Sequence, residues 1–229
     1  MIVIIGGTSG IGFETFKYLK SMGYKTLIGG RTNPVNNSIN YKFIDVSKEE
    51  SVKKFFQNVK RIDGLIYSVG ITAPKKSIKN FDKDIWENII KVNVTGALLV
   101  LKYAYDKLVN TKGKIVIVNS FAARAYSELS GFEYTMSKNA LSGMVKQLSG
   151  EFAKDSVVIN SIFPSMTLTP MLKKNVVKKK LNKITKDIPL KRIAKPIEVA
   201  KAIEFLVNKD NSYMTGCGID LNGGKFLNG

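Results

Sequence analysis

The segment IVIIGGTSGIG, residues 2–12, passes from a β-branched apolar run directly into a glycine-rich turn. Apolar residues then recur at three-residue steps from Phe13 to Met22, and Gly23 stands where a helix C-terminal cap would lie. We therefore predict a strand, a tight turn and an amphipathic helix. Glycines in such a turn let the backbone approach a pyrophosphate, and the helix N-terminus favours anionic charge. The glycine spacing differs from G-x-G-x-x-G, but its place between strand and helix predicts dinucleotide binding.

Short apolar runs alternate with longer helical segments through the rest of the chain. Further strands are predicted at residues 25–29, 41–44, 64–67, 114–119, 157–162 and 218–221. Most of these runs are continuous, as expected for parallel strands that are covered on both faces. Major helices are predicted over residues 82–109, 133–153 and 196–207, the last opened by a proline. The pattern predicts an α/β fold, with residues 1–229 forming a single-domain Rossmann-type, doubly wound parallel sheet.

The composition restricts the functional class. The chain of 229 residues contains no histidine, and Cys217 is its single cysteine, so we expect neither an internal disulfide nor a metal site. No apolar run is long enough to span a membrane, and the first residues do not resemble a signal peptide, which together predict a cytoplasmic protein. Without histidine, proton transfer must come from a carboxylate, a lysine, a tyrosine or the cysteine.

The formal net charge of +18 is unevenly distributed. Between Lys173 and Lys195 there are ten basic side chains and one acid, Asp187. A solvated helix face and a surface that attracts an acidic partner or substrate are both open interpretations. No nucleic-acid-binding motif accompanies the charge, so nucleic acid is not an expected partner.

Two further features carry chemistry. Tyr134 and Lys138 lie four residues apart in a predicted helix, and hence on one face within reach of the same ligand. A phenol has a pKa of about 10, and a nearby ammonium lowers it, which suits proton exchange with an alkoxide. The second strand ends in Gly29-Gly30-Arg31. Because an arginine at this place suits a ribose 2′-phosphate, it favours NADP(H) over NAD(H).

In this order and spacing, the motifs resemble the short-chain dehydrogenase/reductase family over nearly the whole chain. The matching segments are IGGTSGIG at 5–12, Asp45-Val46, YSVG at 67–70, Asn93, Ser120, the Y-x-x-x-K pair, PSMTLT at 164–169, PLKRIAKP at 189–196, MTG at 214–216 and NGG at 222–224. The chain departs from the family at Ile5 in place of threonine, at residues 67–70 in place of N-N-A-G, and at Ser165 in place of glycine.

The resemblance implies a mechanism. Tyr134 would act as general acid/base, Ser120 would stabilise the carbonyl oxygen, Lys138 would hold the nicotinamide ribose, and Asn93 would support a water path. The implied cofactor contacts are Gly6, Thr8, Ser9, Gly10, Ile11, Gly12, Arg31, Asp45, Val46, Ser68, Gly70, Tyr134, Lys138, Pro164, Thr167 and Thr169. A variable lid over the substrate is expected at about residues 165–190. Arg124 and Tyr126 either line the pocket or are ordinary loop residues.

The function implied is an NADPH-dependent oxidoreductase that interconverts a carbonyl and a secondary alcohol. A 3-oxoacyl group on acyl carrier protein is one candidate substrate, because the carrier is acidic and this chain is basic. Because members of the family are usually dimers or tetramers, the resemblance implies a homodimer or homotetramer. The alternative is a cofactor-binding regulatory or scaffold protein with the same fold and no turnover.

Overall fold

The computed structural model describes residues 1–34, 40–175 and 178–226, without the side chains of 173–175, 178–180 and 182. Its centre is a seven-stranded sheet in the order β3-β2-β1-β4-β5-β6-β7, in which every described pair is parallel. The strands are β1 (Ile2–Ile5), β2 (Thr26–Gly30), β3 (Tyr41–Phe43), β4 (Gly64–Tyr67), β5 (Lys114–Val118), β6 (Val158–Pro164) and β7 (Gly218–Leu221). The predicted doubly wound parallel sheet is thus confirmed.

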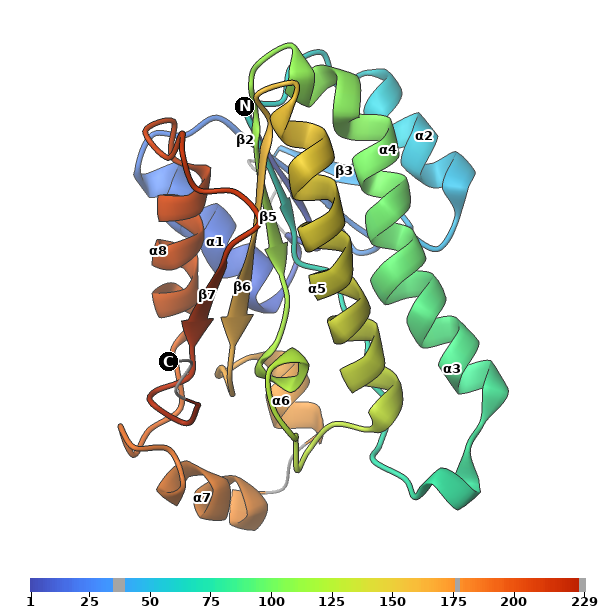
Figure 1. The fold of residues 1–229 in the computed structure, drawn as a ribbon, viewed down its shortest axis with the longest axis vertical. Coiled ribbons are helices and arrows are strands. Elements are labelled where there is room, and N and C mark those ends of the chain that lie inside the picture. Colours follow the sequence, from blue (N-terminus) through green and yellow to red (C-terminus); the bar gives the residue numbers. More distant parts are fainter. Residues whose placement is uncertain (35–39, 176–177, 227–229) are drawn as a thin grey trace.

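Helices cover both faces of this sheet (Figure 1). They are α1 (Gly10–Ser21), α2 (Glu49–Gln57), α3 (Lys83–Ile90), α4 (Gly96–Val109), α5 (Phe132–Ala153), α6 (Pro170–Asn175), α7 (Lys178–Lys186) and α8 (Pro196–Val207). The segment predicted as one helix over 82–109 is instead interrupted by a π turn at Lys91–Thr95, between α3 and α4. No helix in the described ranges is long and apolar enough to cross a membrane.

Alternate residues of β1 point into two separate cores. Val3 and Ile5 pack with α2, α4 and α5, whereas Ile2 and Ile4 pack with α1 and α8. All four side chains are at most 3% exposed, and each contributes about 1.5–3 kcal/mol through burial. Burial on both faces explains why the strand sequences are continuous apolar runs.

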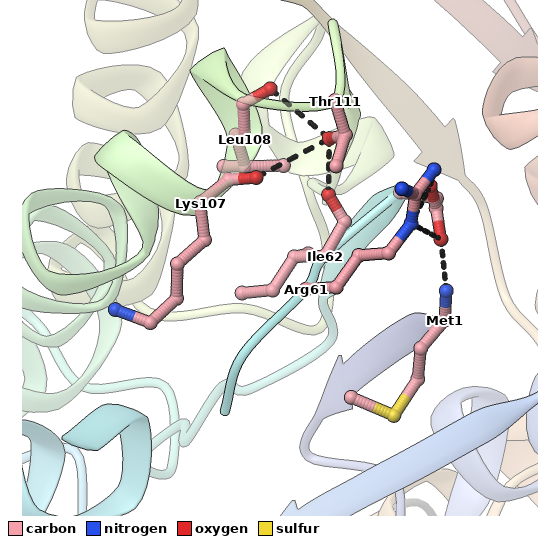
Figure 2. A network of polar contacts seen from close by, with 7 residues as sticks. Met1, Arg61, Ile62, Lys107, Leu108 and Thr111 are labelled. Atoms are coloured by element: carbon pink, nitrogen blue, oxygen red, sulfur yellow. Dashed lines mark hydrogen bonds and ion pairs between the residues drawn. The ribbon is translucent and has the colours of Figure 1, made fainter. Parts of the chain in front are cut away.

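A polar network ties together the amino ends of the central strands (Figure 2). The amino group of Met1 and the guanidinium of Arg61 both donate to the carboxylate of Asp63, the latter at 2.7 Å. The Thr111 hydroxyl donates to the carbonyl of Ile62. These contacts fix the edge of the sheet that is opposite the carboxyl ends of the strands, where ligands of such sheets bind.

Candidate active site

The glycine-rich turn between β1 and α1 forms a cradle that side chains would fill. A Cβ on Gly12 would lie 2.2 Å from the Gly6 carbonyl oxygen, and one on Gly6 would lie 2.7 Å from the Ser68 backbone. Gly6 and Gly10 have positive φ, at 84° and 55°, a region that glycine adopts without strain. The first turn of α1 carries no acidic side chain. These residues therefore fit a dinucleotide pyrophosphate at the helix N-terminus.

The carboxyl end of β6 brings further predicted contacts to the same turn. The Thr169 methyl group would lie 3.6 Å from a Cβ on Gly10. Thr167 is buried, and its hydroxyl donates to the Ser165 carbonyl at 3.1 Å. The residue that replaces the family's glycine therefore takes part in the turn that follows Pro164.

The ends of β2 and β3 supply the other predicted cofactor residues. A Cβ on Gly30 would lie 2.6 Å from the Thr8 methyl group, and Arg31 beyond it is exposed. Burial would raise the pKa of Asp45, but hydrogen bonds from the Ser47 N–H and hydroxyl, with the charge of Arg31 nearby, lower this pKa overall. Val46 is buried against Gly96, so its side chain belongs to the core.

Asn93 lies in the π turn, fully buried. Its amide oxygen accepts from the Ile71 N–H at 2.8 Å, and its nitrogen donates to the Ile71 carbonyl at 3.0 Å and the Ser137 hydroxyl at 2.9 Å. Ser137 in turn donates to the Tyr134 carbonyl at 2.7 Å. Asn93 thus connects the loop after β4 to the helix that carries Tyr134.

Tyr67, which the sequence did not predict as a site residue, supports the π turn. The Tyr67 side chain is fully buried, and its hydroxyl donates to the Val92 carbonyl at 2.8 Å. A Cβ on Gly96 would lie 3.0 Å from this hydroxyl, so glycine leaves room for it. At this departure from N-N-A-G, the tyrosine thus supplies a contact of its own to the π turn.

Ser120, Tyr134 and Lys138 converge at the carboxyl end of β5. The Ser120 hydroxyl accepts from the Ala122 N–H at 3.2 Å, and it lies close enough to Tyr134 to lower the pKa of that phenol. The Lys138 ammonium donates to the Val118 carbonyl at 3.0 Å and lies 5.7 Å from the centroid of the Tyr134 ring. It also lies beside Gly70, whose added Cβ would be 3.4 Å from Nζ.

Burial controls the proton affinities of this pair. It raises the pKa of Tyr134, against a smaller lowering by the Ser120 hydrogen bond. It lowers the pKa of Lys138 to about 8, because the charged ammonium loses solvation. The expected lowering of the tyrosine pKa by the ammonium is therefore not the net effect in this chain without ligands.

A cleft of about 210 Å³ opens beside these side chains. Ser120 and Tyr134 line it, and so do Ile11, Pro164, Thr167 and Thr169 from the predicted cofactor contacts. Its other walls are Thr72, Asn119, Phe121, Ala122, residues 127–130, Ser165, Met166, Met171, Leu172, Ile184 and Lys225. Two of the four catalytic candidates, Ser120 and Tyr134, thus share one cavity with one end of the expected cofactor site, next to the expected lid, whereas Asn93 and Lys138 do not line it.

Arg124 and Tyr126 are not among the lining residues. Arg124 forms an ion pair with Asp220 at 3.3 Å and stacks on the Phe163 ring at 3.7 Å. Tyr126 is 77% exposed and accepts from the Lys75 ammonium at 2.7 Å. The pocket interpretation of these two residues is wrong in this structure. Within the basic segment 173–195, the side chains of 173–180 lie outside the described residues, so its partner interpretation stays a prediction.

No cluster of residues in the described part of the chain could hold a metal ion. The side chains that line the cleft carry hydroxyls, a phenol, the Asn119 amide, the Glu128 carboxylate and the Lys225 ammonium. The Lys138 ammonium lies 5.7 Å from the centroid of the Tyr134 ring. Such a set suits proton transfer and hydrogen bonding to a substrate oxygen.

Comparisons with known proteins agree with this geometry. A family model described as enoyl-(acyl carrier protein) reductase matches residues 6–225. The 3-oxoacyl-acyl-carrier-protein reductase FabG of Aquifex aeolicus is 31% identical, over 98% of this chain and 96% of its own. The ligand-free aldohexose dehydrogenase of Thermoplasma acidophilum superposes with a TM-score of 0.91 at 25% identity, covering 98% of this chain and 92% of that one. The structure of ElxO with NADP bound superposes with a TM-score of 0.88 at 26% identity, covering 98% of this chain and 97% of that one.

Proposed function

Because the chain belongs to the short-chain dehydrogenase/reductase family, an oxidoreductase family, we propose that it interconverts a carbonyl and a secondary alcohol with NADP(H), with Tyr134 as the general acid/base. The observation that carries this proposal is that the half-buried Ser120 and Tyr134 side chains interact on the wall of the cleft. Both hydroxyls there can face one substrate oxygen. The glycine-rich turn adjoins this cleft, because Ile11 of the turn is one of the residues that line it.

When bound, the nicotinamide cofactor supplies or accepts the hydride. In reduction, the Tyr134 hydroxyl gives its proton to the carbonyl oxygen, and the Ser120 hydroxyl stabilises the negative charge that develops there. The raised pKa of Tyr134 keeps the phenol protonated at neutral pH, as an acid must be. Lys138 holds a positive charge near the tyrosine and would hydrogen-bond the ribose hydroxyls of a bound cofactor. Asn93 holds the backbone of Ile71 in place near Lys138. We propose that water beside this turn resupplies the proton.

NADP(H) is the proposed cofactor because Arg31 is exposed just beyond β2, where a ribose 2′-phosphate would lie. The solved ElxO structure with NADP bound supports this choice by likeness. The remaining cofactor contacts are proposed at the residues predicted above, with Val46 acting through its backbone, since its side chain is buried.

A 3-oxoacyl thioester is a candidate substrate, since the relative from Aquifex aeolicus is a reductase of 3-oxoacyl groups on acyl carrier protein. The lid is proposed at residues 165–190, which include α6 and α7 below the carboxyl ends of the strands in Figure 1. Exposed Leu98 on α4 and Met136 on α5 support assembly into a homodimer or homotetramer.

The test is a screen of acyl thioesters, sugars and simple ketones for oxidation of NADPH, with NADH in parallel. We expect turnover of at least one carbonyl class with NADPH. Binding of NADPH without oxidation by any class would instead support a cofactor-binding scaffold. Adding acyl carrier protein at low and high salt would show whether the basic segment 173–195 attracts an acidic partner, because salt screens exposed charges.

A further inference from the structure

One cationic side chain on the wall of the cleft has no part in the chemistry described so far. Lys225, beyond the end of β7, lines the cleft together with Phe121. Its ammonium lies 5.6 Å from the centroid of the Phe121 ring. Phe121 directly follows Ser120 in the sequence. Lys225 and the catalytic serine thus line the same cleft.

The loop that carries Lys225 is held in place by its own contacts. The buried Asn222 side chain donates to the Phe226 carbonyl at 3.0 Å and accepts from the Gly224 N–H at 2.9 Å. The Phe226 ring meets the Phe121 ring edge to face, with centroids 6.4 Å apart. The lysine is thus fixed against the wall that also carries the catalytic serine.

The Lys225 ammonium has no ion-pair partner within residues 1–34, 40–175 and 178–226. Glu128 also lines the cleft, but it is exposed. An ammonium that is half-buried without a counter-ion interacts more strongly with an incoming anion than one in open water does.

The sheet order separates this charge from the expected phosphates of the cofactor. The glycine turn follows β1 and Arg31 follows β2, whereas Lys225 follows β7 at the far edge of the sheet. Three strands, β4, β5 and β6, lie between β1 and β7. An anion at Lys225 is therefore a group of the substrate.

We propose that Lys225 selects a small carbonyl substrate that bears a carboxylate, such as a short oxo acid, together with its hydroxy acid in the reverse direction. This inference rests on the proposed function. The cleft volume of about 210 Å³ lies below the roughly 300–1,000 Å³ of pockets that hold drug-sized ligands, which suits a short substrate. A 3-oxoacyl thioester would place no charge so close to its carbonyl, so the inference favours an oxo acid over a thioester.

The experiment compares NADPH oxidation with matched pairs: levulinate against its methyl ester, and dihydroxyacetone phosphate against dihydroxyacetone. We expect the wild type to prefer levulinate over the ester. Lys225→Met should lower kcat/KM for levulinate about tenfold, the usual scale for losing a charged hydrogen bond, and leave the ester within about twofold. Lys201→Met, at an exposed lysine on α8, should keep the preference.

Equal losses on acid and ester, or no preference in the wild type, would overturn the inference. A Lys225-dependent preference seen only with the phosphate pair would overturn the assignment of a carboxylate. Binding of valerate, which lacks the ketone group of levulinate, is measured calorimetrically in the presence of NADP⁺. It should weaken about tenfold in Lys225→Met. Because this binding needs no turnover, it separates failure of the inference from failure of the proposed function.

Discussion

Burial moves the proton affinities of Tyr134 and Lys138 in opposite directions, because each group loses solvation of its charged form. At neutral pH the phenol keeps its proton, while the ammonium, with a pKa of about 8, is still mostly charged. The site is thus prepared to reduce a carbonyl when both protons are present. A pH dependence follows from the lysine, since the tyrosine titrates higher.

We expect kcat/KM for reduction to fall as the pH rises through about 8, where Lys138 loses its charge. The sign follows from the acid role of the pair: deprotonation removes the positive charge beside the reacting oxygen. The measurement is a pH–rate profile between pH 6.5 and 9.5. The Lys138→Met variant should be slower and lack this inflection. A wild-type profile that is flat or rises across pH 8 would contradict this role.

Arg31 has a separate test. Arg31→Ala should lower kcat/KM with NADPH by about tenfold or more, the scale for a lost charged hydrogen bond, and leave NADH nearly unchanged. Lys25→Ala is the matched control, since this exposed lysine lies at the other end of β2. Equal or better efficiency of the wild type with NADH would refute the role of Arg31.

Among the secondary-structure elements, the π turn at Lys91–Thr95 is where the structure differs from the prediction. Residues 82–109 read as one helix because their apolar periodicity is nearly continuous. The contacts at this interruption come from residues distant in sequence. Asn93 hydrogen-bonds the backbone of Ile71, and the Tyr67 hydroxyl donates to the Val92 carbonyl. Such contacts leave no local signal. The strands, in contrast, were predicted almost to the residue, because a strand buried on both faces has a distinctive composition.

Tyr67→Phe should remove the hydrogen bond from the buried Tyr67 hydroxyl to the Val92 carbonyl, at a cost of about 0.5–1.5 kcal/mol in the free energy of unfolding. Because the turn carries Asn93, we expect kcat to fall several-fold as well, with the affinity for NADPH kept. Denaturant unfolding, fluorescence titration with NADPH and steady-state kinetics measure these three quantities.

The control for this variant is Tyr24→Phe, which removes a hydroxyl contact to Glu204 between α1 and α8, away from the cleft. It should lose stability without losing kcat. If Tyr67→Phe behaves in the same way, Tyr67 supports the fold but does not position the proton path.

At the scale of the whole molecule, the alternation of strands and helices predicted the doubly wound parallel sheet, whose ligands bind at the carboxyl ends of the strands. It did not predict which side chains line the cleft. Arg124 follows the catalytic serine closely and looked like a pocket residue, but it pairs with Asp220, 96 positions away. Lys225 reaches the cleft from the other end of the chain. Loop side chains depend on such remote partners, which a single sequence does not reveal.

The proposed assembly also belongs to this scale. Light scattering should give a mass two or four times that of one chain, and placing lysines at both Leu98 and Met136 should shift it toward the monomer by charging exposed apolar surface. A wild type that is monomeric at micromolar concentration would contradict the proposal.

The central claim is that Tyr134 transfers the proton, and Tyr134→Phe tests it most directly because the ring stays and only the hydroxyl is lost. Single-turnover oxidation of NADPH is followed with the best carbonyl substrate, alongside the dissociation constant of NADPH. We predict a loss of at least about 10²-fold in rate, as expected for removal of a general acid, with NADPH affinity within about twofold of the wild type. Turnover by Tyr134→Phe near the wild-type rate would contradict the account.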